Sequence, residues 1–215
     1  MLIITNTKNY KYGNDLLKLA KQIQKYLPKS IIAVPTTEVY SVAHSKATKL
    51  KVFAQHIGFS DANGRSTGYV TPESIKQSGA SGTILNHSEH PMKFEDIKKT
   101  ITDCKKIKLQ TLVCVKNNSE AQKLIAMSPN PTFIAYEDPK LVSSGKSITQ
   151  YRATEILKFV KLLKNSKIIP VCGAGISDEN DIQAAKILGC QAVLIASAIA
   201  KVKNPESFLK KLQFQ

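Results

Sequence analysis

The 215-residue chain has no tryptophan, and only 7% of its residues are aromatic. Aromatic side chains form the stacking surfaces of proteins that bind single-stranded nucleic acid, so their shortage disfavours that class. Arginine is also scarce, because Arg65 and Arg152 are the only two among 31 basic residues. Since arginine supplies the paired donors that read guanine and clamp phosphate, the sequence argues against base readout too.

Acidic residues are the next shortage: 16 Asp and Glu stand against 31 Lys and Arg, which gives a formal net charge of +15. The lysines are dispersed at helical spacing, as in Lys158, Lys161 and Lys164, which is typical of solvated helix faces. We therefore expect no nucleic-acid partner, although the positive field would attract a small anionic substrate.

Long hydrophobic runs are missing as well. The longest, Ala192–Ala200, is interrupted by Ser197 and is much shorter than the roughly 18 residues that cross a bilayer. The apolar start Met1–Ile4 is too short for a signal peptide and has no basic leader. The four cysteines form no CxxC pair. These features predict a cytoplasmic protein with free thiols and no membrane partner.

In place of long hydrophobic runs, the sequence has short apolar runs rich in Ile, Val and Leu. Such runs are typical of strands buried on both faces. There are eight of them: Leu2–Thr5, Ser30–Val34, Val52–Gln55, Gly82–Leu85, Thr111–Val115, Thr132–Tyr136, Ile168–Cys172 and Ala192–Ala196.

Helical periodicity fills most of the intervals between these runs. In the first interval Leu16, Leu19 and Ile23 form an apolar face opposite lysines. Further helices are predicted for Phe94–Ile107, Ser119–Met127, Thr149–Leu163, Glu179–Leu188 and Pro205–Leu212. Eight predicted strands that alternate with helical segments, without a linker, predict an α/β protein, a compact (β/α)8 barrel forming a single domain over residues 1–215. An open doubly wound sheet is the alternative, since periodicity does not show closure.

In such a barrel the functional groups lie at the carboxyl ends of the strands, and polar residues do follow the predicted strands. Each is a weak signal alone; His87 and His90, for example, have no third metal ligand at suitable spacing, so we expect no metal site. The strand-end motifs are Asn6-Thr7-Lys8, Asn86-His87-Ser88-Glu89, Ala135-Tyr136-Glu137, Cys172-Gly173-Ala174-Gly175-Ile176 and Leu194-Ile195-Ala196-Ser197.

Together and in this order, these motifs resemble the triosephosphate isomerase family, particularly its shorter archaeal branch. The resemblance implies a TIM barrel that interconverts dihydroxyacetone phosphate and glyceraldehyde 3-phosphate without cofactor or metal. It makes Glu137 the catalytic base, with His87 and Lys8 as the other catalytic residues. It also implies a lid over Asp138–Lys146 and a substrate-binding set of Asn6, Thr7, Lys8, Val142, Ser143, Gly175, Ala196 and Ser197.

The sequence departs from the family pattern near the lid and the presumed subunit contacts. Asp138 stands where proline commonly follows the base, and His90 stands where the family usually has arginine. Ser143-Ser144-Gly145 replaces a Gly-Thr-Gly tip, and Ala198 replaces a frequent glycine. None of these changes removes a charged catalytic group. By resemblance, the segment Asn63–Tyr69 inserts into a second copy, which predicts a homodimer or homotetramer.

Two alternatives stay open at this point. One is another sugar-phosphate isomerase or epimerase on the same barrel, which would share the phosphate loops after the seventh and eighth strands. The other is a non-catalytic anion- or nucleic-acid-binding protein on a barrel that has lost its catalysis.

Overall fold

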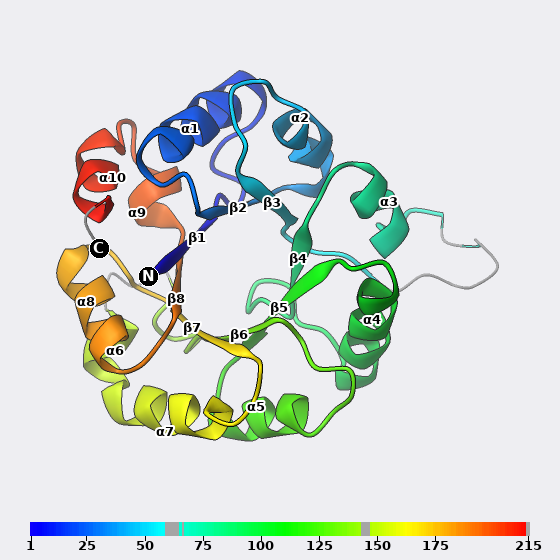
Figure 1. Ribbon diagram of the computed structural model, residues 1–215, viewed down its shortest axis with the longest axis vertical. Helices are drawn as coiled ribbons and strands as arrows, with labels where there is room; N and C mark the ends of the chain where they lie inside the picture. The colour runs from blue at the N-terminus through cyan, green and yellow to red at the C-terminus, as the bar shows by residue number, and fades with distance from the viewer. Residues whose placement is uncertain (59–64, 66, 143–146, 214–215) are drawn as a thin grey trace.

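The computed structural model describes residues 1–58, 65, 67–142 and 147–213 of the chain. Its strands are all parallel and close into a barrel in which each strand pairs with the next and β8 pairs with β1 (Figure 1). This closure confirms the (β/α)8 barrel and excludes the open sheet. The strands are β1 (Leu2–Asn6), β2 (Ile31–Val34), β3 (Lys51–Ala54), β4 (Gly82–Leu85), β5 (Gln110–Val115), β6 (Phe133–Tyr136), β7 (Ile169–Gly173) and β8 (Ala192–Ile195).

Each strand lies within one residue of its predicted bounds, because continuous apolar runs of this length fit only a strand that is buried on both faces. Alternate side chains point into the barrel, where Ile4, Phe53 and Leu112 belong to one buried cluster. The rings of Phe53 and Phe133 meet edge to face there, 6.1 Å apart. Gly82 makes room for this packing, since a Cβ at that position would lie 2.4 Å from the Phe53 ring.

The other strand side chains point outward and pack against a ring of helices, which forms the second and larger core cluster. The long helices were predicted from their periodicity. The helical segments are α1 (Gly13–Tyr26), the 3-10 turn η1 (Thr36–Glu38), α2 (Val39–Ala43), α3 (Pro72–Gln77), α4 (Phe94–Lys106), α5 (Asn118–Ile125), α6 (Ile148–Tyr151), α7 (Ala153–Leu163), α8 (Glu179–Ile187), α9 (Ser197–Ala200) and α10 (Glu206–Leu212).

The helix predicted over Thr149–Leu163 is wrong in one respect, because the chain breaks at Arg152 (φ −135°) into α6 and α7. Apolar periodicity continues across the break and therefore does not reveal it. The short helices α2, α3 and α9 were not predicted, since four to six residues are too few to show a period.

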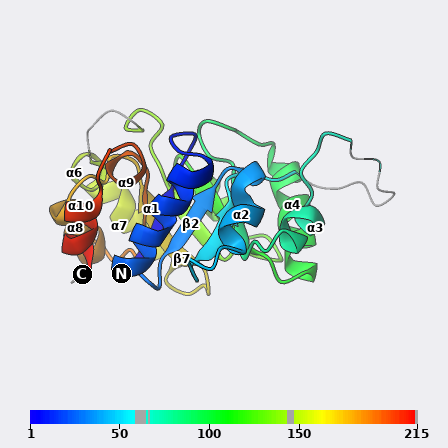
Figure 2. The same ribbon diagram turned by 90° about the horizontal axis from the view of Figure 1, so that it is seen from above.

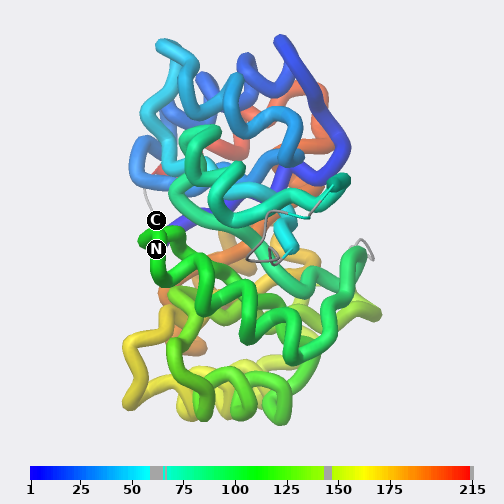
Figure 3. Tube along the Cα trace, turned by 90° about the vertical axis from the view of Figure 1, so that its right-hand side faces the viewer, coloured from blue at the N-terminus to red at the C-terminus, as the bar shows by residue number. Residues whose placement is uncertain are grey.

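The two ends of the chain meet on one side of the barrel. Helix α10 packs beside α1, and the blue and red parts of the tube occupy the same half of the molecule (Figure 3). Both termini lie at the edge where β1 begins (Figure 2), so the carboxyl ends of the strands, and the loops that follow them, gather at the opposite edge. No helix within residues 1–58, 67–142 or 147–213 is long and apolar enough to cross a membrane.

Candidate active site

A cavity at the carboxyl ends of the strands brings together residues from β1, β4, β6, β7 and β8. It is lined by Asn6, Lys8, His87, Glu137, Val142, Ala174, Gly175, Ile176, Leu194, Ala196 and Ser197. A larger cavity of about 400 Å³ lies behind Glu137, and its walls include the apolar side chains of Phe94, Ile97 and Leu124. We take the smaller cavity as the candidate site, because three titratable side chains from three different strand ends converge on it.

Lys8 is fixed by the backbone of the loop after β1. Its own backbone has a positive φ of 43°, and the Asn6 carboxamide oxygen accepts the Lys8 N–H at 3.0 Å. The amide of Gln55, after β3, donates to the Lys8 carbonyl at 3.0 Å. The Lys8 ammonium is only 11% exposed and lies 2.5 Å from a carboxylate oxygen of Glu89. The loop thus holds one cation at the cavity rim.

His87 has a defined tautomer. Its Nδ1 accepts the backbone N–H of Glu89 at 3.2 Å, so the proton of the neutral ring lies on Nε2. Nε2 faces Oε2 of Glu137 at 3.6 Å, which is too long for a hydrogen bond. The ring is 7% exposed. His87 therefore presents an N–H donor to the cavity rather than a base.

Glu137 is 6% exposed, and its Oε2 has no hydrogen-bond partner in the part of the chain that the structure describes. A buried carboxylate oxygen without a partner is costly, and such groups concentrate at functional sites. Gly173 lets the carboxylate lie here, because a Cβ on Gly173 would be 2.8 Å from Glu137 Oε1. Burial raises the pKa of the Cys114 thiol well above its usual range, and the Glu137 carboxylate raises it further, so Cys114 stays neutral beside the base.

The loops after β7 and β8 form the other wall. Ala174 and Gly175 both have positive φ, 76° and 71°, which turns the chain sharply after β7. The N–H of Ile148 donates to the Ala174 carbonyl at 3.2 Å. Ser197 begins α9, and the first N–H groups of a helix have no partner within it. Gly175, Ala196 and Ser197 line the cavity, so their backbone groups form part of its wall.

The structure brings together most of the predicted site residues in the lining of the cavity: Asn6, Lys8, His87, Glu137, Val142, Gly175, Ala196 and Ser197. The side chain of Thr7 is not there. Thr7 is fully buried, and its hydroxyl donates to the Ala33 carbonyl at 3.0 Å, because the residue after Asn6 points back into the barrel wall. Ser143 lies outside the described residues, as do Asn63, Gly64 and Ser66 of the predicted insertion segment Asn63–Tyr69.

Several supporting residues were not assigned from the sequence. Asp181 is 2% exposed, and it accepts the Ser177 N–H at 2.9 Å and the Ser177 hydroxyl at 3.1 Å, which holds the loop after β7. The Asn86 amide donates to the Cys114 carbonyl at 2.9 Å. Gln55 and Asn86 follow predicted strands, so their position was a usable signal. Asp181 lies inside a helix, and no pattern distinguished it.

His90 does not form a metal site with His87. Its ring stacks on His56, with centroids 3.7 Å apart, and burial together with His90 lowers the pKa of His56 to about 4. Within residues 1–58, 65, 67–142 and 147–213, no three His, Cys, Asp or Glu side chains gather as a metal site would require.

Comparison with known proteins points to one family. A family model described as triosephosphate isomerase matches residues 1–214. The chain belongs to the triosephosphate isomerase family. It is 34% identical to the triosephosphate isomerase of Methanocaldococcus jannaschii, with 99% of this chain and 98% of that protein covered. It is 32% identical to the enzyme of Sulfurisphaera tokodaii, with 97% and 92% covered.

A solved structure, the triosephosphate isomerase from Bartonella henselae, superposes with a TM-score of 0.70 over 93% of this chain and 94% of that one. At 19% identity it supports the barrel fold alone. The membership also confirms the resemblance drawn from the strand-end motifs, since the similarity to the archaeal relatives runs through almost the whole chain.

Proposed function

We propose that the chain is an aldose–ketose isomerase that interconverts dihydroxyacetone phosphate and D-glyceraldehyde 3-phosphate through an enediolate. The observation that carries the proposal is the buried Oε2 of Glu137, which has no hydrogen-bond partner among the described residues and faces the Nε2 of His87 at 3.6 Å. A base and a hydrogen-bond donor that face each other in one small cavity are what proton transfer beside a carbonyl requires.

In this reaction Glu137 acts as the base. Its carboxylate takes a proton from the carbon next to the carbonyl of the substrate, and returns it to the neighbouring carbon. One carboxylate serves both transfers, because the two carbons are bonded to each other. Burial of Glu137 supports this role, since its Oε2, which accepts no hydrogen bond from the described residues, keeps a reactive lone pair.

His87 and Lys8 stabilise the oxygen atoms. Negative charge develops on the carbonyl oxygen as the proton leaves, and the Nε2–H of His87 donates to that oxygen. Neutral His87 also moves a proton between the two oxygens as the carbonyl position changes. Lys8 supplies a fixed positive charge at the rim, and its ion pair with Glu89 restrains the ammonium there.

The phosphate group lies, in this proposal, against backbone N–H groups of Gly175 and of Ala196-Ser197 at the start of α9, with Val142 and Ser143 contributing from the lid. Asn6 completes the site by fixing Lys8. The contacts of Thr7 support a structural role beside Lys8 in place of direct substrate binding. No metal or cofactor is part of the reaction.

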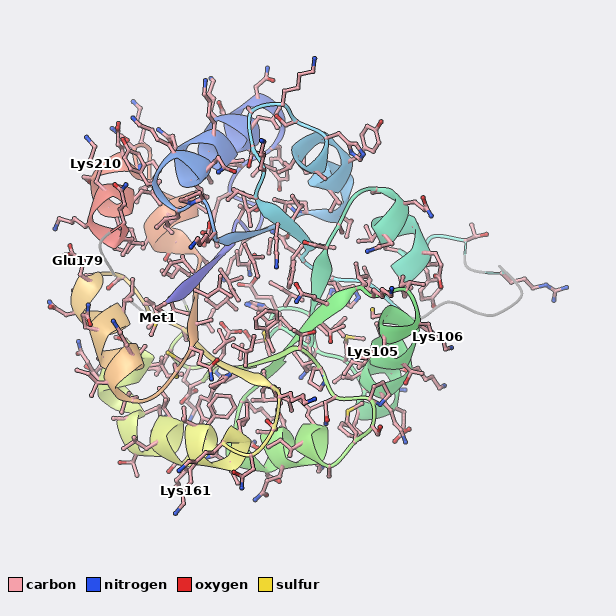
Figure 4. All side chains as sticks on the ribbon, viewed as in Figure 1. Met1, Lys105, Lys106, Lys161, Glu179 and Lys210 are labelled. Atoms are coloured by element: carbon pink, nitrogen blue, oxygen red, sulfur yellow. The ribbon has the colours of Figure 1, made fainter. Side chains whose placement is uncertain are left out.

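The same proposal covers assembly and location. We propose that the chain forms a homodimer or homotetramer through the segment Asn63–Tyr69, of which Tyr69 is 69% exposed. We also propose that it acts in the cytoplasm. The positive surface supports substrate capture: lysines such as Lys161 and Lys210 point outward from the helix ring (Figure 4), which fits attraction of a phosphate ester better than a single nucleic-acid groove.

The two other functions considered from the sequence are disfavoured. Another sugar-phosphate isomerase or epimerase conflicts with the family of the chain. A barrel without catalysis would be expected to have lost a charged group of the site, whereas Lys8, His87 and Glu137 line one cavity.

A coupled assay tests the proposal. Conversion of glyceraldehyde 3-phosphate to dihydroxyacetone phosphate is followed through reduction of the product by a dehydrogenase. We expect turnover that depends on protein concentration and is abolished by a phosphate-bearing analogue of the enediolate. Folded protein with no turnover above background would contradict the function.

A further inference from the structure

Both sequence neighbours of Glu137 are held by helix α7. On one side, the ring of Tyr136 packs against Phe159 in the middle of α7, with centroids 5.6 Å apart. On the other side, Oδ2 of Asp138 accepts a hydrogen bond from Nε of Arg152, directly before α7, at 2.7 Å. The base therefore lies between two anchor points on the same helix.

Asp138 uses both carboxylate oxygens. Its Oδ1 accepts the backbone N–H of Lys140 at 2.9 Å, and its carbonyl accepts the N–H of Leu141 at 2.9 Å. The side chain thus closes the turn that leaves β6 while it binds Arg152. Burial alone would raise the pKa of Asp138, but the Lys140 N–H and the Arg152 guanidinium outweigh it and lower the pKa below its usual value. Asp138 is ionised at neutral pH.

Arg152 is held at the joint between α6 and α7. Its N–H donates to the Ile148 carbonyl at 2.8 Å, and its carbonyl accepts the N–H of Ile156 at 3.0 Å. Ile148 in turn donates to Ala174 in the loop after β7. The joint therefore connects the turn after Glu137 with the loop after the neighbouring strand β7.

We propose that Arg152 is a positioning residue for the isomerase reaction, acting through Asp138 to hold the carboxylate of Glu137 in the cavity. Proline commonly follows the base in this family, and its ring fixes the backbone φ. This chain has Asp138 directly after the base, and the ion pair between Asp138 and Arg152 restrains the backbone at that position. The inference rests on the proposed function, and it assigns a role to one of the only two arginines in the sequence.

The first test is Arg152→Met, which keeps much of the side-chain length and removes the donor. We expect kcat to fall roughly tenfold with KM changed less than about twofold, because a small displacement of the base slows chemistry without touching the phosphate contacts. Lys161→Met is the matched control: it removes the same charge from α7, where Lys161 points away from the barrel (Figure 4). It should keep wild-type kcat. The melting temperature of both variants should stay within about 3 °C, since the Arg152 side chain is 43% exposed.

A double-mutant cycle separates positioning from a general structural effect. In an Asp138→Asn background Arg152 has lost its ionic partner, so Arg152→Met should cost little further kcat. In an Asp138→Pro background the proline ring restrains the backbone next to Glu137, so Arg152→Met should again lower kcat only slightly. Arg152→Lys should recover part of the kcat lost in Arg152→Met.

Three results would overturn the inference. Wild-type kcat in Arg152→Met would show that the ion pair does not position the base. If Arg152→Met lowers kcat as much in the Asp138→Asn and Asp138→Pro backgrounds as in the wild type, Arg152 does not act through Asp138. An equal loss of kcat in Lys161→Met would show that the effect of Arg152→Met comes from the change in surface charge. An inactive wild-type enzyme in the same assay would instead refute the proposed function, and this inference with it.

Discussion

At the scale of single residues, the site depends on the N–H group that His87 presents to the cavity and on the carboxylate of Glu137 that faces it. The N–H of Glu89 occupies Nδ1 of His87, so the ring offers its Nε2 proton to the cavity. Glu137 offers an oxygen that accepts no hydrogen bond from any residue the structure describes. Neither property follows from residue type, since both depend on backbone groups that the fold places nearby. Catalysis at this site is therefore a matter of arrangement more than of unusual side chains.

Replacing Glu137 with Gln tests the base directly. The variant keeps the shape of the side chain but cannot accept the substrate proton, so we expect kcat to fall roughly 10³-fold or more. Binding of a phosphate-bearing analogue, measured by calorimetry, should persist because the phosphate contacts lie on the loops after β7 and β8. Glu95→Gln, on the exposed face of α4, is the control. Equal loss of binding and turnover in Glu137→Gln would assign Glu137 another role.

Gly173→Ala tests the space around the base. The added Cβ would lie 2.8 Å from Oε1 and 3.1 Å from Cγ of Glu137, so the carboxylate must shift. A displacement of this kind should lower kcat by about 10- to 100-fold in steady-state kinetics. Gly58→Ala is a suitable control, because its Cβ would meet nothing nearer than a Tyr69 ring atom at 3.5 Å. Unchanged kcat in Gly173→Ala would mean that the site tolerates a displaced base.

At the scale of elements, loops after the strands carry the polar groups and helices hold those loops. Helix α7 anchors the turn after β6 through Arg152, and α8 anchors the loop after β7 through Asp181. Both anchors are charged side chains bound to groups outside their own helix. The helices therefore do more than bury the outer faces of the strands, since they also fix the loops that line the cavity.

Asp181→Ala tests the anchor on α8. The variant leaves the Ser177 N–H and hydroxyl without their acceptor, so we expect a loss of about 2 kcal/mol in unfolding free energy. KM for the triose phosphate should also rise severalfold, because Gly175 lies in the released loop.

Asp178→Ala is the comparison for this variant. It removes the N-terminal cap of α8, which accepts the Asp181 N–H at 2.9 Å, and should cost about 1 kcal/mol with KM unchanged. Denaturant titration and steady-state kinetics measure the two quantities. Equal KM values for the two variants would argue against a substrate-binding role for the loop.

At the scale of the whole molecule, apolar and charged side chains occupy different layers of the barrel. Apolar side chains fill the barrel and the layer beneath the helices, and lysines cover the outer ring (Figures 1 and 4). The cavity opens at the edge opposite the termini. Tyr69, the last residue of the segment predicted to insert into a second copy, is exposed, and His56, which stacks on His90, precedes that segment in the sequence.

The oligomer is testable in solution. We expect light scattering after size exclusion to give at least twice the mass of one chain at micromolar concentration. Tyr69→Glu places a charge on the exposed ring position and should weaken the assembly, while Tyr12→Glu, at another exposed tyrosine (52%), should not. An active monomer of wild-type protein at that concentration would refute the assembly.

The sequence by itself determined the eight strands and placed the candidate site residues at or after their carboxyl ends. Eight apolar runs placed the strands within one residue, because strands buried on both faces leave a continuous hydrophobic signal. The strand-end motifs located Asn6, Lys8, His87 and Glu137. Only the tertiary structure decided barrel closure, the break at Arg152, the inward turn of Thr7 and the pairs Asp138–Arg152 and Ser177–Asp181. These depend on contacts between elements distant in sequence, and local periodicity holds no information about such contacts.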